Sequence, residues 1–288
     1  MAFDISLAKI DTYFSCIIVS MVKIIASDLD GTLLYNGHLS ENNYRAVKQL
    51  QDNGIEFVVA SGRNITEVKM LDFKDIECSK VLINGTIVVD KDYNLISADY
   101  LKRDELDLLL AYIDEYKVGT IFYGTEERYG YNIDIMNDSF KDDPNVFGNA
   151  FFKGLIEIKD LDEIKANICK VEIMDGVRFE MLKEMGDKIL ATKKFGVTSS
   201  NRNNIEVTLP FVDKYYGLKK ILEKNAYKDD EVAIFGDSDN DFELFENVAE
   251  SYAMGNANDR IKSHAKYVIE SCDDDGFYLQ VMKILHSK

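Results

Sequence analysis

Short, mostly apolar runs recur along the chain, and each of them ends at a cluster of polar or acidic residues. The runs cover residues 22–26, 55–60, 81–83 and 232–235. Apolar residues that fill a strand without alternating are typical of a parallel sheet that is buried on both faces. We therefore predict an α/β fold with a doubly wound, Rossmann-like parallel sheet.

Helical periodicity accompanies these runs towards both ends of the chain. In residues 42–53, Tyr44, Val47 and Leu50 fall on one face, and Gly54 is a typical helix stop. In the last third of the chain, helices and strands are predicted to alternate. The helices are expected over 216–225, 241–248, 261–265 and 277–285, and the strands over 251–254 and 267–270.

The middle of the chain has a different pattern, typical of an antiparallel α+β module. A hairpin is expected near 86–94. Helices are predicted over 104–116, 161–168 and 176–189, and strands over 120–123, 128–133, 170–174, 194–200 and 204–209. We therefore predict an inserted domain over 86–206 that divides a core domain into residues 21–85 and 207–288. Residues 1–20 are expected to be an N-terminal extension.

An excess of acidic residues limits the partners of this chain. It has 34 Lys and Arg against 51 Asp and Glu, for a formal net charge of −17. Such a charge argues against binding to nucleic acid or anionic lipid, so we expect neither partner. It would also repel an anionic small molecule, so any phosphate group needs a metal ion or a local cradle.

Neither a membrane anchor nor a metal–thiolate site is expected. The apolar run at 13–25 is too short to span a bilayer and contains Lys23, and Asp4 and Asp11 make residues 1–20 a poor signal peptide. The cysteines are far apart and form no CxxC pair. We predict a cytoplasmic protein that is a monomer or a weak homo-oligomer.

Asp28 and Asp30 follow the first predicted strand directly, and Gly31 permits a turn there. Ligands of parallel sheets bind beyond the carboxyl ends of the strands. Two carboxylates that converge at such a point would bind a hard cation such as Mg2+. An Asp-rich turn without a ligand is the alternative interpretation.

Two further segments suit an anionic ligand. Ser61, Gly62 and Arg63 follow the second predicted strand, where a hydroxyl and backbone N–H groups can bind a phosphate oxygen. Ser61 could equally be an ordinary helix N-cap. Lys214, ahead of the predicted helix 216–225, could neutralise a phosphate together with a carboxylate, but taken alone it is typical of a surface lysine.

A second acidic cluster follows the predicted strand 232–235. Asp237, Asp239 and Asp241 lie within five residues, with Asn240 between the last two. Carboxylates this close repel one another, and a bound divalent cation removes that repulsion. A solvated acidic loop is the alternative, which a buried strand leading into the cluster disfavours.

Four features match, in chain order, the four motifs of the haloacid dehalogenase superfamily of phosphohydrolases. They are the first acidic pair, the segment 61–63, Lys214 and the acidic cluster 237–241. Over residues 21–288 the chain resembles the Cof-like phosphatases of that superfamily, which carry an α/β cap between the second and third motifs. Asn84-Gly85 and the segments 253–257 and 274–276 look like further signatures of this subfamily. One departure is that Tyr215 and Tyr216 follow Lys214, where the family has glycine.

The resemblance implies a role for each motif residue. Asp28 would attack phosphorus and Asp30 would act as general acid and then base. Mg2+ would be held by Asp28, the backbone carbonyl of Asp30 and Asp237. Ser61, Gly62 and Lys214 would bind the phosphoryl group. Asp241 would support the metal and its waters or would position Lys214, and Asn240 would organise the loop behind the metal ligands. Arg63 and Asn84 are candidates for contact with substrate.

The predicted function is that of a Mg2+-dependent phosphatase of small phosphorylated metabolites, such as sugar phosphates, working through an aspartyl-phosphate. Two alternatives stay open. A phosphotransferase or phosphomutase would pass the same phosphoryl group to a sugar hydroxyl. A non-catalytic regulator would bind a phosphorylated metabolite without turnover.

Overall fold

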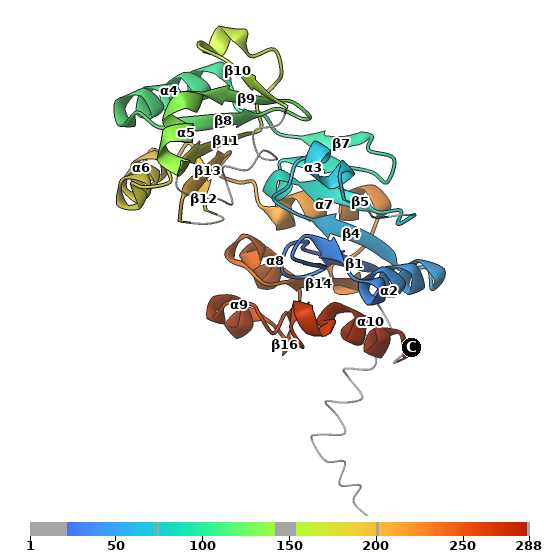
Figure 1. Ribbon diagram of the computed structural model, residues 1–288. Coiled ribbons are helices and arrows are strands. Elements are labelled where there is room, and N and C mark those ends of the chain that lie inside the picture. The colour runs from blue at the N-terminus through green and yellow to red at the C-terminus, as the bar shows by residue number, and fades with distance from the viewer. Residues whose placement is uncertain (1–21, 72, 74, 142–153, 200–201, 287–288) are drawn as a thin grey trace, which may run out of the picture. The chain divides into compact units, whose positions relative to one another are not determined.

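The computed structural model describes residues 22–71, 73, 75–141, 154–199 and 202–286, and the predicted extension 1–20 lies outside them. The chain divides into two compact units (Figure 1). The first unit comprises Met1–Ser61, Met70–Ile96 and Lys214–Lys288. The second unit comprises Gly62–Lys69 and Ser97–Asp213, and it is inserted in the first.

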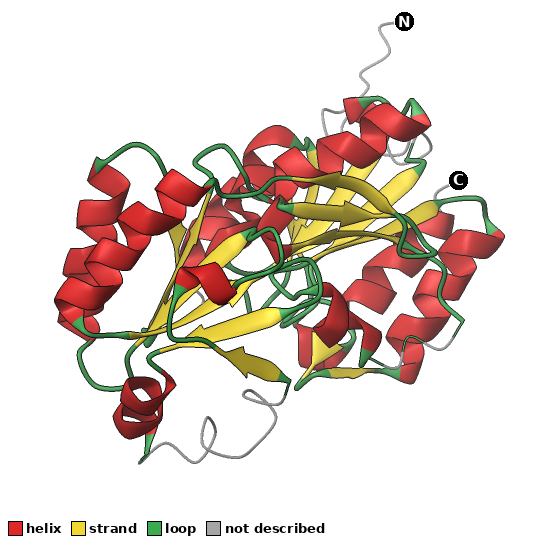
Figure 2. Ribbon diagram, turned by 90° about the horizontal axis from the view of Figure 1, so that it is seen from above, coloured by secondary structure: helices red, strands yellow, loops and turns green. Residues whose placement is uncertain are grey.

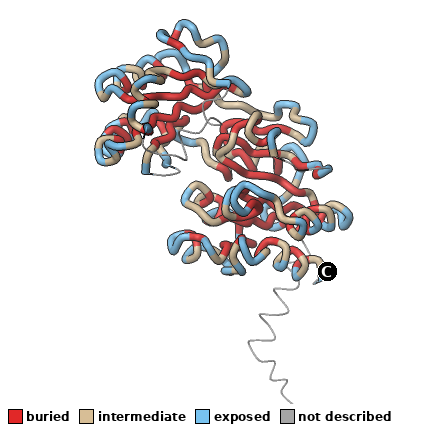
Figure 3. The backbone as a smooth tube through the Cα atoms, viewed as in Figure 1, coloured by how far each residue is buried: buried red, intermediate tan, exposed pale blue. Residues whose placement is uncertain are grey.

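An eight-stranded sheet forms the centre of the first unit. From β16 to β5 all neighbouring strands are parallel, and β6 is antiparallel to β5. The spatial order is β16 (Tyr267–Val268), β15 (Glu250–Ala253), β14 (Val232–Gly236), β1 (Ile24–Ser27), β4 (Glu56–Ala60), β5 (Ser79–Leu82), β6 (Ile87–Val89) and β7 (Leu95–Ala98). The central strands β1 and β14 are buried along their whole length (Figure 3), which explains why their sequences do not alternate.

Helices cover both faces of this sheet (Figure 2). On one face, apolar residues of α7 and α8 join the core that includes Ile24 and Ile234. On the other face, Phe277 of α10 makes edge contacts with Phe57 and Phe235, whose ring centroids lie 6.0 and 4.9 Å away. The helices are α2 (Glu41–Asp52), α7 (Lys214–Asn225), α8 (Phe242–Asn247), α9 (Asp259–His264) and α10 (Gly276–His286).

Short elements complete the first unit. They are the small hairpin β2 (Leu34–Tyr35) and β3 (His38–Leu39) and the 3-10 turns η1 (Ile83–Gly85), η3 (Asp229–Glu231), η4 (Asp239–Asp241) and η5 (Cys272–Asp274). Turn η1 follows β5 and turn η4 follows β14, so both lie beyond the carboxyl ends of strands, where ligands of parallel sheets bind. Turn η5 lies close to β2.

The hairpin expected near 86–94 belongs to the first unit rather than to the insertion. Strand β6 pairs with β5 through Leu82 and Ile87, and β7 lies next to β6 at the edge of the same sheet. Backbone pairing with a strand that is already part of the sheet outweighs the local change in sequence pattern at residue 86. The compact first unit accordingly extends to Ile96.

The second unit is built on a six-stranded, mainly antiparallel sheet. Its order is β10 (Leu155–Glu157), β9 (Arg128–Tyr131), β8 (Gly119–Tyr123), β11 (Lys170–Met174), β13 (Asn204–Thr208) and β12 (Gly196–Thr198), and only β10 and β9 pair in parallel. The helical elements of this unit are α3 (Ile65–Lys69), α4 (Arg103–Tyr116), α5 (Ile133–Phe140), η2 (Leu161–Glu163) and α6 (Phe179–Ala191).

One face of this second sheet packs against helices α4 and α6. Leu109, Ile113 and Ile189 of these helices join Phe122 and Val171 of the sheet in one buried core. A doubly wound α/β unit with an α+β unit inserted in its chain is the predicted fold class, and the structure confirms it. The assignment of the first unit as the catalytic core and of the second unit as a cap remains a prediction.

One helix prediction in the second unit is wrong. Instead of a helix over 161–168, the structure has the short 3-10 turn η2, after which Ile164 is extended. The reason is backbone pairing with other segments. The Leu101 N–H donates to the Ile168 carbonyl (2.8 Å), and the Cys169 N–H donates to the Tyr123 carbonyl (2.8 Å). These bonds lead the chain into β11 and outweigh local helix propensity.

Gly217 of α7 and Gly186 of α6 should respond oppositely to replacement by alanine. A Cβ on Gly217 would lie 2.5 Å from Val81 Cγ1 and 2.8 Å from Gly85 Cα, whereas a Cβ on Gly186 meets nothing closer than 3.4 Å. We expect Gly217→Ala to lower the free energy of unfolding by about 1–3 kcal/mol through overpacking. Gly186→Ala should raise it by about 0.5–1 kcal/mol through helix propensity. Urea denaturation measures both, and equal signs would contradict the packing described.

Candidate active site

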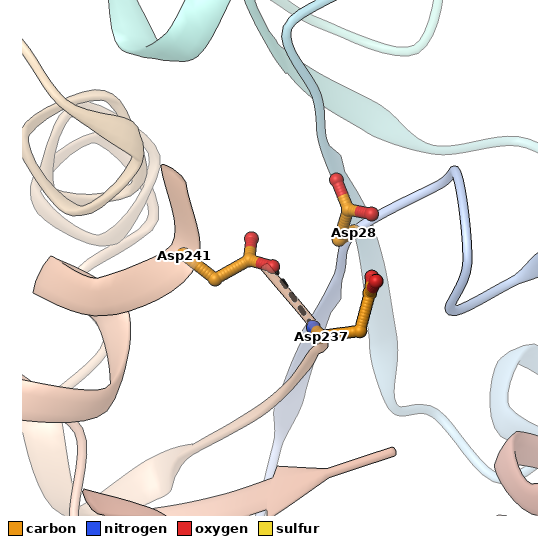
Figure 4. Close-up of side chains that lie close together, drawn as sticks. All are labelled: Asp28, Asp237 and Asp241. Carbon is orange, nitrogen blue, oxygen red and sulfur yellow. Dashed lines mark hydrogen bonds between the residues drawn. The ribbon is translucent and has the colours of Figure 1, made fainter. Parts of the chain in front are cut away.

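Three aspartates meet beyond the carboxyl ends of the central strands. Asp28 follows β1 and Asp237 follows β14, two neighbouring parallel strands, while Asp241 ends the turn η4 (Figure 4). One carboxylate oxygen of each residue lies within 4.8 Å of one oxygen of the other two. The parallel register therefore brings together residues that are more than 200 positions apart in the chain.

Lys214 stands between two of these carboxylates. Its Nζ atom lies 2.5 Å from Asp28 Oδ1 and 2.7 Å from Asp241 Oδ1, and its side chain is fully buried. Burial by itself lowers the pKa of Lys214, but the carboxylates of Asp241 and Asp28 outweigh it and the pKa is raised. The ammonium is therefore charged at neutral pH.

Lys214 differs from its prediction in position. It is the first residue of α7 rather than a residue ahead of the helix, and it is not the surface lysine that its type alone suggests. Tyr215 and Tyr216 do not displace it. Their rings lie within 6.0 and 4.5 Å of the Nζ atoms of Lys219 and Lys220. Side chains that follow one another on a helix point in different directions, so both tyrosines are compatible with a buried Lys214.

Both oxygens of Asp241 are occupied by the protein. Its Oδ1 accepts from Lys214, and its Oδ2 accepts from the backbone N–H groups of Asp237 (3.0 Å) and Ser238 (3.2 Å). Asp241 thus holds the loop that carries Asp237. This arrangement suits the predicted supporting role better than direct metal binding.

Asp28 and Asp237 each have an oxygen suited to a cation. Thr32 Oγ1 donates to Asp237 Oδ1 (2.9 Å), and Lys214 occupies Asp28 Oδ1. Within the described residues, the Oδ2 atoms of both aspartates accept no hydrogen bond. Asp28 is buried and Asp237 is half-buried, and carboxylate oxygens that lie close together without a donor are the ligands that Mg2+ prefers, so the residues present fit this metal.

The electrostatics of the two aspartates favour the binding of a cation. Burial is the largest cause that raises the pKa of Asp28 well above its usual range. The ammonium of Lys214 offsets this effect only in part, and the carboxylates of Asp241 and Asp237 add to it. The pKa of Asp237 is raised to about 6, mainly by burial and next by repulsion from the Asp241 carboxylate. A divalent cation would stabilise both carboxylates in their charged form.

Asp30 and Gly31 form the turn that follows Asp28. The side chain of Asp30 is exposed to solvent, as expected of a group that exchanges protons with a bound molecule. Gly31 has a φ of +87°, and a Cβ there would lie 2.6 Å from Asp237 Oδ2. Only glycine fits this turn, both for its backbone conformation and for the closeness of Asp237.

Ser61 and Asn84 lie at the same edge of the sheet. Ser61 is buried and follows β4. Its N–H donates to the Val81 carbonyl (2.8 Å), and its own carbonyl accepts from the Asn84 N–H (3.0 Å). Asn84 has a left-handed backbone with φ of 51°, and its Oδ1 accepts from Asn240 Nδ2 (3.2 Å). The loops after β4, β5 and β14 are thereby joined.

Gly62 and Arg63 belong to the second compact unit, together with α3. The predicted phosphate contact of Gly62 and the predicted substrate contact of Arg63 remain predictions. In the same unit, Arg178 forms an ion pair with Asp175 at 2.6 Å and donates to the backbone carbonyls of Tyr116 and Lys117.

Sequence reasoning missed several polar residues. Thr32, whose hydroxyl binds Asp237, stood in the first motif but had no assigned role. In the second unit, Lys170 is buried between Glu206 (3.2 Å) and Glu172 (3.8 Å), and Tyr123 donates to Glu172 (2.6 Å). The signal was the alternation of polar and apolar residues in strands β11 and β13, which marks a sheet with one polar face.

Comparison with known proteins identifies the family. Residues 25–281 match the family described as haloacid dehalogenase-like hydrolase. The chain belongs to this family. The prediction of family membership is therefore confirmed, and so is the prediction that the chain is a hydrolytic enzyme.

Curated relatives match along nearly the whole chain. The 5-amino-6-(5-phospho-D-ribitylamino)uracil phosphatase YcsE of Bacillus subtilis is 27% identical over 258 residues, which is 88% of this chain and 92% of that protein. The phosphatase YbjI of Escherichia coli, named for the same substrate, is 25% identical over 275 residues, covering 92% and 96%.

Solved structures share the fold. A haloacid dehalogenase-like hydrolase of Bacillus subtilis has a TM-score of 0.78 at 24% identity, covering 91% of this chain and 99% of that one. A HAD/COF-like hydrolase of Plasmodium vivax has a TM-score of 0.76 at 23% identity, covering 94% and 100%. These similarities confirm the predicted fold class.

Among the helices of the described residues, none has the length and apolarity needed to cross a membrane.

Replacement of Lys214 by methionine should destabilise the protein. Asp28 and Asp241 would then be buried without a counter-ion, a situation that costs about 3–5 kcal/mol in folding free energy. The loss should shrink at about pH 5, because burial raises the pKa of Asp28 and protonation neutralises that carboxylate. Urea denaturation at about pH 5 and 7.5 measures it, with Lys219→Met, a half-exposed lysine of the same helix, as control. An equal loss for both variants would contradict the burial argument.

Mg2+ should stabilise the protein more strongly as pH rises. The pKa of Asp237 is about 6 in the folded chain, whereas its ordinary value is 3.8. Protonation of this group therefore stabilises the metal-free fold below about pH 4, and this contribution is lost as the pH rises through about 6. The bound cation offsets this loss. The increase in unfolding temperature on addition of MgCl2 should therefore be small at about pH 5 and larger at about pH 7.5. Equal increases, or an increase kept in Asp237→Asn, would contradict this prediction.

Proposed function

We propose that this protein is a Mg2+-dependent phosphatase of small phosphorylated metabolites. The observation that carries the proposal is the pairing of buried Asp28 with buried Lys214 beside Asp237 at the carboxyl end of β1. A carboxylate held by a cation in a dry site is oriented to attack a phosphoryl group and is shielded from competing water. The phosphatase names of the relatives support the same reaction.

In the first half-reaction, an Asp28 oxygen attacks phosphorus while the bond from phosphorus to the ester oxygen breaks. Asp30 gives its proton to that departing oxygen, and the product alcohol leaves. The phosphoryl group is now bound to Asp28 as an aspartyl-phosphate. The ammonium of Lys214, 2.5 Å from Asp28 Oδ1, offsets the repulsion between the two anions.

In the second half-reaction, the Asp30 carboxylate takes a proton from water, and the water oxygen attacks phosphorus. The bond between phosphorus and Asp28 breaks, which restores the carboxylate and releases inorganic phosphate. Ser61 and Gly62 would donate hydrogen bonds to phosphoryl oxygens. Mg2+, bound by Asp28, Asp237 and the Asp30 carbonyl, would neutralise the phosphoryl oxygens and orient them.

The substrate class is a small phosphorylated metabolite with a polar leaving group, present in the cytoplasm. Three relatives are named as 5-amino-6-(5-phospho-D-ribitylamino)uracil phosphatases. That compound is a phosphorylated polyol joined to a base, so it belongs in a test panel beside sugar phosphates. Arg63 and Asn84 are proposed to contact the part of the substrate that lies beyond the phosphate.

Asp28→Asn should abolish phosphate release. Loss of the attacking group lowers kcat by about 10³-fold or more, as for other enzymes that lose their nucleophile. We would measure phosphate release from sugar phosphates, nucleotides and the ribitylaminouracil phosphate, with and without Mg2+. Wild type should require Mg2+, and the folded variant should be inactive.

Other outcomes of this assay discriminate between functions. Undiminished activity of Asp28→Asn, or full activity after chelation of Mg2+, would contradict the mechanism. A rearranged phosphorylated product without free phosphate would instead indicate the phosphomutase alternative. Binding without any turnover would indicate a regulator.

A further inference from the structure

The turn after Asp28 is held in place by hydrogen bonds of its own backbone. The Gly31 N–H donates to the Leu34 carbonyl (3.0 Å), and the Leu34 N–H donates to the Leu29 carbonyl (2.7 Å). A further hydrogen bond is made by the carbonyl of Gly31. It accepts a hydrogen bond from Nδ2 of Asn256, at 2.8 Å.

Asn256 is itself anchored from the other side. Its Oδ1 accepts from the backbone N–H of Cys272, also at 2.8 Å. The side-chain amide of Asn256 therefore bridges two backbone segments, one on each side of it. Its acceptor and one of its donors are committed to this bridge, which distinguishes it from a side chain that reaches out towards a ligand.

The segment that carries Asn256 is also bonded to the loop after β14. The Met254 N–H donates to the Gly236 carbonyl (3.1 Å), and the Asn258 N–H donates to the Asp237 carbonyl (3.2 Å). One short segment thus links the loop of Asp28 to the loop of Asp237. Within the segment, the link to the Asp28 loop is made by the Asn256 side chain.

Rotation of the peptide that follows Gly31 would disturb the metal-binding carboxylates. Thr32, at the other end of this peptide, donates its hydroxyl to Asp237 Oδ1 at 2.9 Å. The Cα of Gly31 is packed so closely against Asp237 that a Cβ would lie 2.6 Å from its Oδ2. The orientation of this peptide consequently determines where Thr32 holds Asp237 and where Asp30, the preceding residue, projects.

We propose that Asn256 is a positioning residue for the Mg2+ site. Its bond to the Gly31 carbonyl fixes the peptide between Gly31 and Thr32, and through it the relative positions of Asp28, Asp30 and Asp237. The effect on turnover rests on the proposed phosphatase function, whereas the effect on the loop and on Mg2+ affinity does not. Asn256 is exposed, so its replacement leaves no cavity and the local effect is separable from global unfolding.

The first test is hydrogen–deuterium exchange of the segment 28–34 in Asn256→Ala. Exchange of its amides should accelerate about five-fold, the factor that corresponds to the net loss of one hydrogen bond. Asn256→Asp keeps the acceptor for Cys272 but loses the donor to Gly31, so it should accelerate the same amides. The matched control is Asn53→Ala at the carboxyl end of α2, which removes a similar exposed hydrogen bond, from the Asn53 side-chain amide to the Gln49 carbonyl (2.8 Å).

The second test is the affinity for Mg2+ by titration calorimetry. We expect the dissociation constant of Asn256→Ala to rise several-fold, with an unfolding temperature close to that of Asn53→Ala. In an active enzyme, kcat at subsaturating Mg2+ should fall while KM for the phosphate ester changes little. Unchanged exchange in the segment 28–34, or a looser segment with unchanged Mg2+ affinity, would overturn the inference.

These outcomes are distinct from a failure of the proposed function. An inactive wild-type protein would contradict phosphatase activity but would leave both the exchange and the calorimetric results decisive for Asn256. A rise in KM with unchanged exchange would make Asn256 a substrate contact and would overturn its positioning role.

Discussion

The buried ion triad of Lys214, Asp28 and Asp241 is the interaction on which the arrangement of the site depends. Burying charges is costly unless they are paired, so these three residues are stable only together. Lys214 lies on α7, Asp28 follows β1 and Asp241 ends η4, so the pairing also fixes a helix against a strand and a turn. The same contact that holds the loops together orients the proposed nucleophile.

The triad leaves an excess of negative charge, and this excess gives the site its chemistry. Two carboxylates share one ammonium, and Asp237 adds a third carboxylate nearby. Burial raises the pKa values of Asp28 and Asp237, and the neighbouring carboxylates add to this effect. In the proposed mechanism, a divalent cation would compensate both the carboxylates and the incoming phosphoryl anion. An acidic protein can in this way bind an anionic substrate.

Much of the first unit could be predicted because buried parallel strands have continuous apolar sequences, and because their carboxyl ends place Asp28, Ser61 and Asp237 at one edge of the sheet. Features that depend on distant backbone pairing could not. Strand β6 joins the core sheet through β5, and the helix expected over 161–168 is replaced by pairing at Ile168 and Cys169. Periodicity carries no information on such partners.

The site was predictable to the same extent. The aspartates were found because carboxylates that follow buried parallel strands indicate a cation site, whereas the role of Lys214 was assigned through the family resemblance. Thr32 and Asn256 act by holding other groups, and their contacts with Asp237 and with the Gly31 carbonyl exist only in the folded chain. Likewise, burial of Lys214 is a property of its place on α7 and not of its neighbours Tyr215 and Tyr216.

The covalent role of Asp28 is the central claim, and trapping the phosphoryl group on it is the most direct test. Asp30→Asn, in which water attack is slowed, would be mixed with radiolabelled p-nitrophenyl phosphate, whose leaving group needs no proton, and quenched with acid during a single turnover. Peptide mapping should find the label on Asp28, only when Mg2+ is present. Release of p-nitrophenol with no label on Asp28, or with the label on another residue, would contradict the account.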